Sequence, residues 1–91
     1  MAEAKNRSEV ASDVDRVIKS RLPLYMRGIE ITEDMPLLGE GLGLDSVGLV
    51  ELFLKLEEYF GIPFPVELIE KEPLTVGVII DHAFNALGRF S

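Results

Sequence analysis

The sequence has no cysteine, a single histidine and no long apolar run. Without cysteine the chain forms neither a disulfide framework nor a thiolate metal site, so any thiol chemistry has to come from an attached group. The absence also fits a reducing compartment. No apolar run approaches the roughly 20 residues that a membrane span requires. Because the first residues, MAEAKNRSEV, lack the apolar region of a signal peptide, we expect a cytoplasmic protein with no membrane span.

The chain is short, and its charge is unevenly spread. Its 91 residues allow one small domain, residues 1–91, in which we expect residues 1–7 to be a flexible N-terminus. Residues 1–29 carry a net charge of +2 and residues 30–91 a net charge of -9. This acidity argues against nucleic acid as a partner, because phosphate binding needs a basic face. It fits partner proteins with basic patches, and it equally fits a domain kept soluble by its charge.

Helical periodicity accounts for most of the sequence. Apolar residues recur at helical spacing in several segments, and no Val/Ile-rich alternation with hairpin turns is present. The predicted helices cover residues 8–22, 46–60, 66–72 and 76–87. Ser8 and Thr75 are the expected N-caps of the first and last helices, and Pro23 and Gly88 are their expected stops. The predicted fold class is therefore all-α.

The connection between the first two helices, residues 23–45, contains too many glycines and prolines for a regular helix. It also carries large apolar residues that have to be buried somewhere: Leu24, Ile29, Ile31, Met35, Leu37, Leu38, Leu42 and Leu44. We therefore expect a long ordered loop that packs across the other helices, with a short helical turn near Pro36.

The helix predicted for residues 46–60 has two apolar stripes. The core stripe consists of Leu49, Leu52, Phe53, Leu56 and Phe60. Truncation of Phe53 or Phe60 to alanine is expected to cost roughly 3–5 kcal/mol.

The second stripe, which we call the apolar ridge, consists of Val47, Val50 and Leu54. A simple amphipathic helix needs only one such stripe. The ridge either packs under the long loop or docks a partner protein, and docking is favoured because the ridge begins directly after Ser46. Three acids surround it: Glu51, Glu57 and Glu58.

Asp45 and Ser46 follow a glycine-rich loop and open this helix. The Asp45 side chain is expected to cap the helix, which contributes roughly 1 kcal/mol, and its charge suits the positive end of the helix dipole. The Ser46 hydroxyl projects from the helix start, where backbone N–H groups favour an added phosphodiester. Taken alone, however, an Asp-Ser pair is most simply a helix cap.

Catalysis is not expected from these residues. A serine nucleophile needs a general base, and the only histidine, His82, is expected on the solvent side of the last helix. The segment Leu-Asp-Ser-Val-Gly lacks the G-x-S-x-G pattern of a nucleophile elbow. The loop glycines complete no nucleotide-binding motif, and the acids form no EF-hand pattern. We therefore predict no catalytic residue and no metal site.

The surroundings of Ser46 are more specific than the Asp-Ser pair. They comprise the loop glycines, LDSV at residues 44–47, the acidic helix, FGI at residues 60–62 and then Pro65. From about residue 8 to residue 87 the chain resembles acyl carrier proteins in these motifs and in the order of its helices. The resemblance implies a single carrier domain: a four-helix bundle with a long ordered loop between the first two helices and a short third helix.

The resemblance also implies a function. Ser46, flanked by Asp45, would receive a 4′-phosphopantetheine arm from coenzyme A through a phosphopantetheinyl transferase. The arm would carry acyl chains as thioesters between acyl-loading and acyl-processing enzymes of lipid, fatty acid or specialised metabolite biosynthesis. The protein itself would therefore not be an enzyme. Enzymes with basic patches would bind to the second helix. Together with Val50 of the ridge, the positions carried over for this contact are Val47, Glu51, Leu54, Glu57, Glu58 and Glu70.

Some positions depart from the family pattern. Val47 replaces the usual leucine, and Gly48 replaces the acid of fatty-acid carriers and costs up to about 1 kcal/mol in the first helical turn. These departures favour a stand-alone carrier of a specialised pathway. Two alternatives remain open: an aminoacyl or peptidyl carrier that uses the same site, and an unmodified helical adaptor that docks through the apolar ridge. No feature demands an oligomer, so a monomer is expected.

Overall fold

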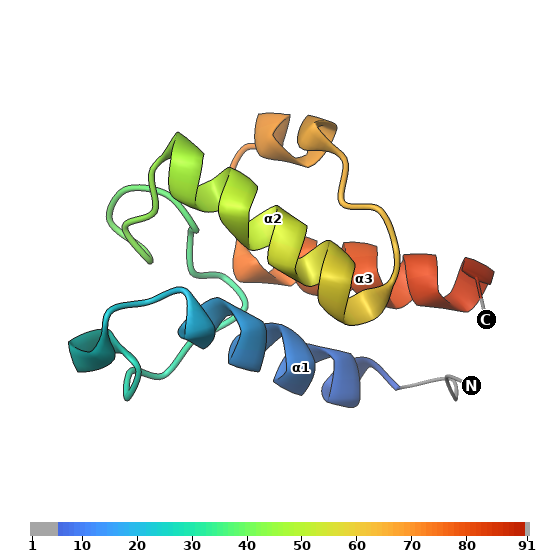
Figure 1. Ribbon diagram of the computed structural model, residues 1–91, viewed down its shortest axis with the longest axis horizontal. Helices are drawn as coiled ribbons and strands as arrows, with labels where there is room; N and C mark the ends of the chain where they lie inside the picture. Colours follow the sequence, from blue (N-terminus) through green and yellow to red (C-terminus); the bar gives the residue numbers. More distant parts are fainter. Residues whose placement is uncertain (1–5, 91) are drawn as a thin grey trace.

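The computed structural model describes residues 6–90, which form an all-helical domain that contains no β-strand (Figure 1). The elements follow one another as α1 (Arg7–Ser20), η1 (Leu24–Met26), α2 (Ser46–Phe60), η2 (Val66–Glu70) and α3 (Val76–Phe90), where η denotes a 3₁₀ helix. The all-α prediction is confirmed for this part of the chain. No helix in it is long and apolar enough to cross a membrane.

The expected short third α-helix is a 3₁₀ helix, so the described chain holds three α-helices rather than four. Its backbone bonds have i to i−3 spacing, because Leu68 N–H donates to Pro65 O and Lys71 N–H donates to Leu68 O. The prolines at positions 65 and 73 leave too few residues between them to offset the cost of starting an α-helix.

The outer ends of α1 and α3 also differ from the prediction. The N-cap of α1 is Asn6 rather than Ser8, because Asn6 and Glu9 form a reciprocal capping box with side-chain to backbone bonds of 2.8 and 3.0 Å. Of the segment expected to be flexible, residues 1–5 lie outside the described residues, whereas Asn6 and Arg7 belong to this helix start. At the other end, α3 continues through Gly88 instead of stopping there.

One hydrophobic core lies among the three α-helices, where α1 packs against both α2 and α3. Its fully buried side chains include Val10, Val14, Ile18, Leu37, Leu49, Leu52, Leu56 and Ile79. The Leu37 in this set comes from the connection between α1 and α2, which lies beside the start of α2 in Figure 1. The connection is therefore part of the core and fixes where α2 begins.

Backbone hydrogen bonds hold this connection against the start of α3. Leu37 N–H donates to Leu74 O at 3.1 Å, and Val76 N–H donates to Met35 O at 3.0 Å. The short helical turn expected near Pro36 is reduced to one hydrogen-bonded turn just before it, in which Met35 N–H donates to Thr32 O at 3.2 Å. Pro36 itself forms an isolated β-bridge with Thr75. The only 3₁₀ helix described in the connection is η1. Two leucines of the connection are exposed instead of buried as expected: Leu24 at 79% and Leu38 at 38%.

Arg7 ties α1 to the connection and to α3. Its guanidinium donates two hydrogen bonds to Glu33, of 2.7 and 2.8 Å, and further bonds to Asp81 Oδ1. These bonds, first of all those to Glu33, raise the pKa of Arg7, and the Arg7 bond lowers the pKa of Glu33. Since the pKa of Glu33 is lower in the folded state, this ion pair stabilises the fold above the ordinary pKa of glutamate. The contribution is lost as the pH falls through the lowered value.

The two phenylalanines of the predicted core stripe are not equivalent. Phe53 is nearly fully buried, and the centroid of its ring lies 6.0 Å from that of Phe64. Phe60, in contrast, is only half-buried. We expect Phe53→Ala to lower the free energy of unfolding by about 3–5 kcal/mol and Phe60→Ala by about half as much. Urea unfolding measures both, with Tyr25→Ala, which truncates an aromatic side chain that is 85% exposed, as the control. Equal losses for Phe53 and Phe60 would contradict the difference in burial.

Candidate functional site

A folded glycine loop leads into α2. Gly39 and Gly43 have φ angles of 64° and 74°, the left-handed region that glycine adopts without strain. These glycines let the loop fold back onto residues 36–38. There Leu42 N–H donates to Pro36 O at 3.0 Å, and Leu44 N–H donates to Leu37 O at 3.1 Å. Because Leu42 is also buried in the core, the loop holds the start of α2 in one place.

Asp45 is the N-cap of α2. Its backbone is extended, and its Oδ1 accepts a hydrogen bond from Gly48 N–H at 2.7 Å. A Cβ atom on residue 48 would lie 3.3 Å from that oxygen and 3.5 Å from Leu44 Cδ2. Glycine at position 48 therefore leaves room for the cap, a role that the sequence did not reveal.

Ser46 is the first residue of α2 and is exposed. Its hydroxyl makes no hydrogen bond to any other described residue. The backbone behind it is fixed by the cap and by Leu49 N–H, which donates to Asp45 O at 2.9 Å. A phosphodiester on Ser46 would lie at the positive end of the helix dipole, which stabilises negative charge. The residues present therefore fit an arm attached through phosphate.

The apolar ridge begins next to Ser46 and is open to solvent. Val47, Val50 and Leu54 are 67%, 44% and 54% exposed. The interpretation that the ridge packs under the long loop is therefore wrong. The loop leucines that are buried, Leu37 and Leu42, belong to the core together with the other stripe of α2. An exposed row of apolar side chains is typical of a surface that another protein covers.

The glutamates predicted to surround the ridge have internal partners. Glu58 forms an ion pair with Lys55 of the same helix at 3.8 Å. Glu57 is half-buried, and its Oε2 accepts a hydrogen bond from Phe64 N–H at 2.9 Å, so it holds the segment that follows α2.

The two remaining glutamates lie apart from these. Glu51 pairs with an arginine of α1, Arg21, and Glu70 is exposed on η2. Of the four predicted contact acids, three are therefore already engaged within the chain. No local sequence pattern indicates the pairing of Glu51, because its partner lies 30 residues away.

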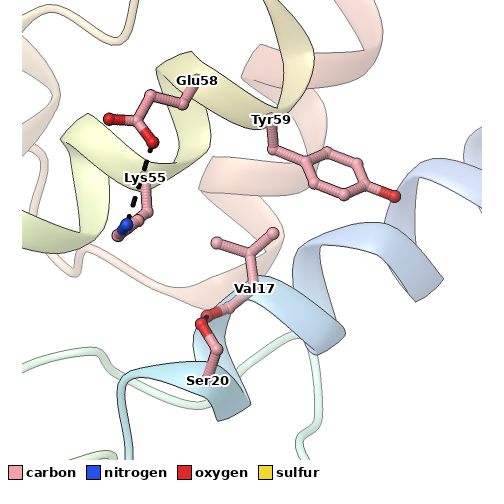
Figure 2. A pocket seen from close by; sticks show the side chains of 5 residues that line it. All are labelled: Val17, Ser20, Lys55, Glu58 and Tyr59. Atoms are coloured by element: carbon pink, nitrogen blue, oxygen red, sulfur yellow. Dashed lines mark hydrogen bonds and ion pairs between the residues drawn. The ribbon is translucent and has the colours of Figure 1, made fainter.

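A shallow hollow of about 330 Å³ lies between α1 and α2, lined by Val17, Ser20, Lys55, Glu58 and Tyr59 (Figure 2). The Tyr59 ring points across it toward α1, where its hydroxyl donates to Asp13 Oδ1 at 3.0 Å. Because the hollow lies along the second half of α2, it is separate from the Ser46 end of the helix.

His82 is not the ordinary surface residue that the sequence predicted. It is half-buried, and its Nε2 donates to Pro63 O at 2.7 Å. Its ring packs edge-on against that of Phe64, with the two ring centroids 4.8 Å apart. Pro63 follows the end of α2, and Ser46 begins that helix of 15 residues, a length of about 22 Å. His82 therefore lies at the wrong end of α2 to act as a base for Ser46. No cluster of three or more potential metal ligands occurs within residues 6–90.

Comparison with known proteins agrees with this geometry. A family model described as the phosphopantetheine attachment site matches residues 14–83 of the chain. The match runs from α1 into α3 and includes the glycine loop, Ser46 and the apolar ridge. No solved structure matches the chain.

Proposed function

Because the chain belongs to the family defined by the phosphopantetheine attachment site, we propose that Ser46 is the attachment residue and that the protein is an acyl carrier. The family bears a 4′-phosphopantetheine prosthetic group, and its members are carriers rather than enzymes. Carrier domains interact with a phosphopantetheinyl transferase and with biosynthetic enzymes. The observation that carries the proposal is the exposed, unbonded hydroxyl of Ser46 on a capped and rigidly held helix start.

The attachment step uses Ser46 Oγ as the nucleophile. Oγ forms a bond to the β-phosphorus of coenzyme A, the pyrophosphate bond breaks, and adenosine 3′,5′-bisphosphate leaves while the transferase accepts the hydroxyl proton. The Asp45 cap keeps the first turn of α2 intact, and the helix dipole favours the new phosphodiester. Once bound, the arm supplies a thiol on which acyl groups are held as thioesters. The chain contributes the position of the arm and the surface that enzymes recognise.

We assign docking to the apolar ridge together with Glu51, Glu57, Glu58 and Glu70, and name these residues the docking face. The exposed ridge supports this assignment, because its burial by a partner would remove apolar area from water next to Ser46. The acidity of residues 30–91 would attract enzymes with basic patches from a distance. Glu57, which is half-buried and holds Phe64, is the least available of these contacts.

The docking assignment is tested by the double variant Val50→Ser with Leu54→Ser. Both side chains are exposed, so we expect little change in stability but a roughly tenfold loss in kcat/KM for the transferase, as for two contact residues of an interface core. Steady-state modification rates and urea unfolding give the two readouts. Leu24→Ser is the matched control, since it removes an apolar side chain that is 79% exposed on η1. An unchanged kcat/KM in the double variant would remove the ridge from the docking face.

An acyl cargo is supported by the resemblance of residues 44–62 to acyl carrier proteins, and a stand-alone carrier of a specialised lipid or metabolite pathway fits Val47 and Gly48 best. The arm-bearing protein is incubated with a malonyl- or acyl-transferring enzyme and, in a separate reaction, with an amino-acid-adenylating enzyme. Intact mass then identifies the thioester. An acyl adduct alone supports the proposal, whereas an aminoacyl adduct alone would make the chain an aminoacyl or peptidyl carrier. We further propose that it acts as a monomer in the cytoplasm.

A further inference from the structure

Glu51 belongs to the docking face and lies at its edge toward α1. On the surface of α2 it lies one turn from Val47 on one side and one turn from Leu54 on the other. Its Oε1 accepts a hydrogen bond from Nη2 of Arg21, and the two charged groups form an ion pair. The two side chains are 52% and 33% exposed, so an approaching protein can reach both.

Arg21 is held where it can make this contact. It is the C-cap of α1, and its backbone N–H donates to Ile18 O and Lys19 O. From this fixed position the side chain crosses from α1 to α2 and sets its guanidinium against the carboxylate of Glu51. That is the position in which a basic side chain of a partner enzyme would bind, so the free protein already carries a substitute for it.

We propose that Arg21 is an internal competitor on the docking face, because a partner enzyme that binds Glu51 has to displace it. The inference rests on the proposed function, since it assumes that enzymes dock on α2. A partner that offers an arginine replaces the lost guanidinium contact with an equivalent planar one. A partner that offers only lysine provides a point charge and replaces it less well. Because displacing Arg21 costs the same free energy in either case, its presence lowers the affinity of every partner that binds through Glu51.

The expected effect is modest, because half-exposed ion pairs are weak. Arg21→Ala is expected to tighten the binding of an arginine-bearing partner by about two- to fivefold at low salt. Loss of one positive charge also increases the general attraction of any cation. Lys19→Ala is the matched control, because it removes the same charge from α1 while its own ion pair, at 3.3 Å, is with Asp15 of the same helix.

A hexa-arginine peptide provides a test that does not depend on the attachment of the arm. The apo-protein is titrated with this peptide at low salt, and the side-chain carboxyl signal of Glu51 is followed by NMR. We expect Arg21→Ala to bind about two- to fivefold more tightly at Glu51 than Lys19→Ala does. In a Glu51→Gln background, Arg21→Ala and Lys19→Ala are expected to behave alike in the overall affinity for the peptide. Equal affinities of Arg21→Ala and Lys19→Ala with Glu51 present would overturn the inference.

The same variants are then compared as substrates of a phosphopantetheinyl transferase. A higher kcat/KM for Arg21→Ala than for Lys19→Ala supports the competition for Glu51. If the wild-type chain is modified but the two variants react equally, the inference fails and the proposed function stands. If the wild-type chain is not modified at all, the proposed function fails, and the peptide titration still decides whether Arg21 competes for Glu51.

Discussion

Ser46→Ala is expected to abolish attachment of the phosphopantetheine arm completely and to leave the fold intact. The hydroxyl is the nucleophile of the proposed transfer, and no other group at the start of α2 replaces it. Its side chain is exposed and makes no hydrogen bond within the described part of the chain, so its loss changes the free energy of unfolding by no more than about 0.5 kcal/mol. Incorporation of a fluorescent coenzyme A derivative by a transferase provides the readout.

A matched control for this variant is Ser12→Ala, which removes an exposed serine from α1. It is expected to be labelled at the wild-type rate. Circular dichroism and urea unfolding establish that both variants are folded. Labelling that persists in Ser46→Ala would place the arm on another residue and would refute the assignment of the site.

Gly41→Ala is expected to disrupt the loop that positions Ser46. A Cβ atom on residue 41 would lie 1.8 Å from Pro36 O and 2.7 Å from Pro36 C. Both are backbone atoms, so the clash cannot be relieved by a side-chain rotation. The loop has to move, and the bond from Leu42 N–H to Pro36 O and the burial of the Leu42 side chain are lost with it. We expect the free energy of unfolding to fall by about 2–4 kcal/mol.

The matched control is Gly28→Ala in the same connection, where an added Cβ would meet no atom within 4 Å. Urea unfolding is expected to leave this control close to wild type. A folded fraction of Gly41→Ala should also be a poorer transferase substrate, because the start of α2 is no longer fixed. Wild-type stability for Gly41→Ala would show that the turn around Pro36 is not packed as described.

Features that depend on neighbouring residues could be predicted from the sequence. The helix α2 begins at Ser46 and ends at Phe60 as expected, because an aspartate cap precedes it and Gly61 follows it in the left-handed conformation. The apolar ridge could also be recognised, since its spacing follows from helical periodicity alone. Which stripe of α2 faces the core could also be predicted, because the core stripe has five apolar residues, both phenylalanines among them, and the ridge has three.

Features that depend on distant residues could not be predicted. Nothing near Glu51 indicates that Arg21 of α1 binds it, and nothing near Glu57 indicates that it holds the backbone of Phe64. The burial of His82 depends likewise on the segment after α2, which folds over α3. Local patterns therefore indicate the candidate site, whereas the packing of separate segments decides which of its charges are available to a partner.

The most direct test of the account is the intact mass of the wild-type chain after incubation with coenzyme A and a phosphopantetheinyl transferase of broad specificity. The account predicts a gain of one phosphopantetheine group, which peptide mapping places on Ser46. No gain on a protein shown to be folded, or a gain that maps to another residue, would contradict the central claim. In the first case an unmodified adaptor that docks through the apolar ridge would become the better explanation of the exposed surface.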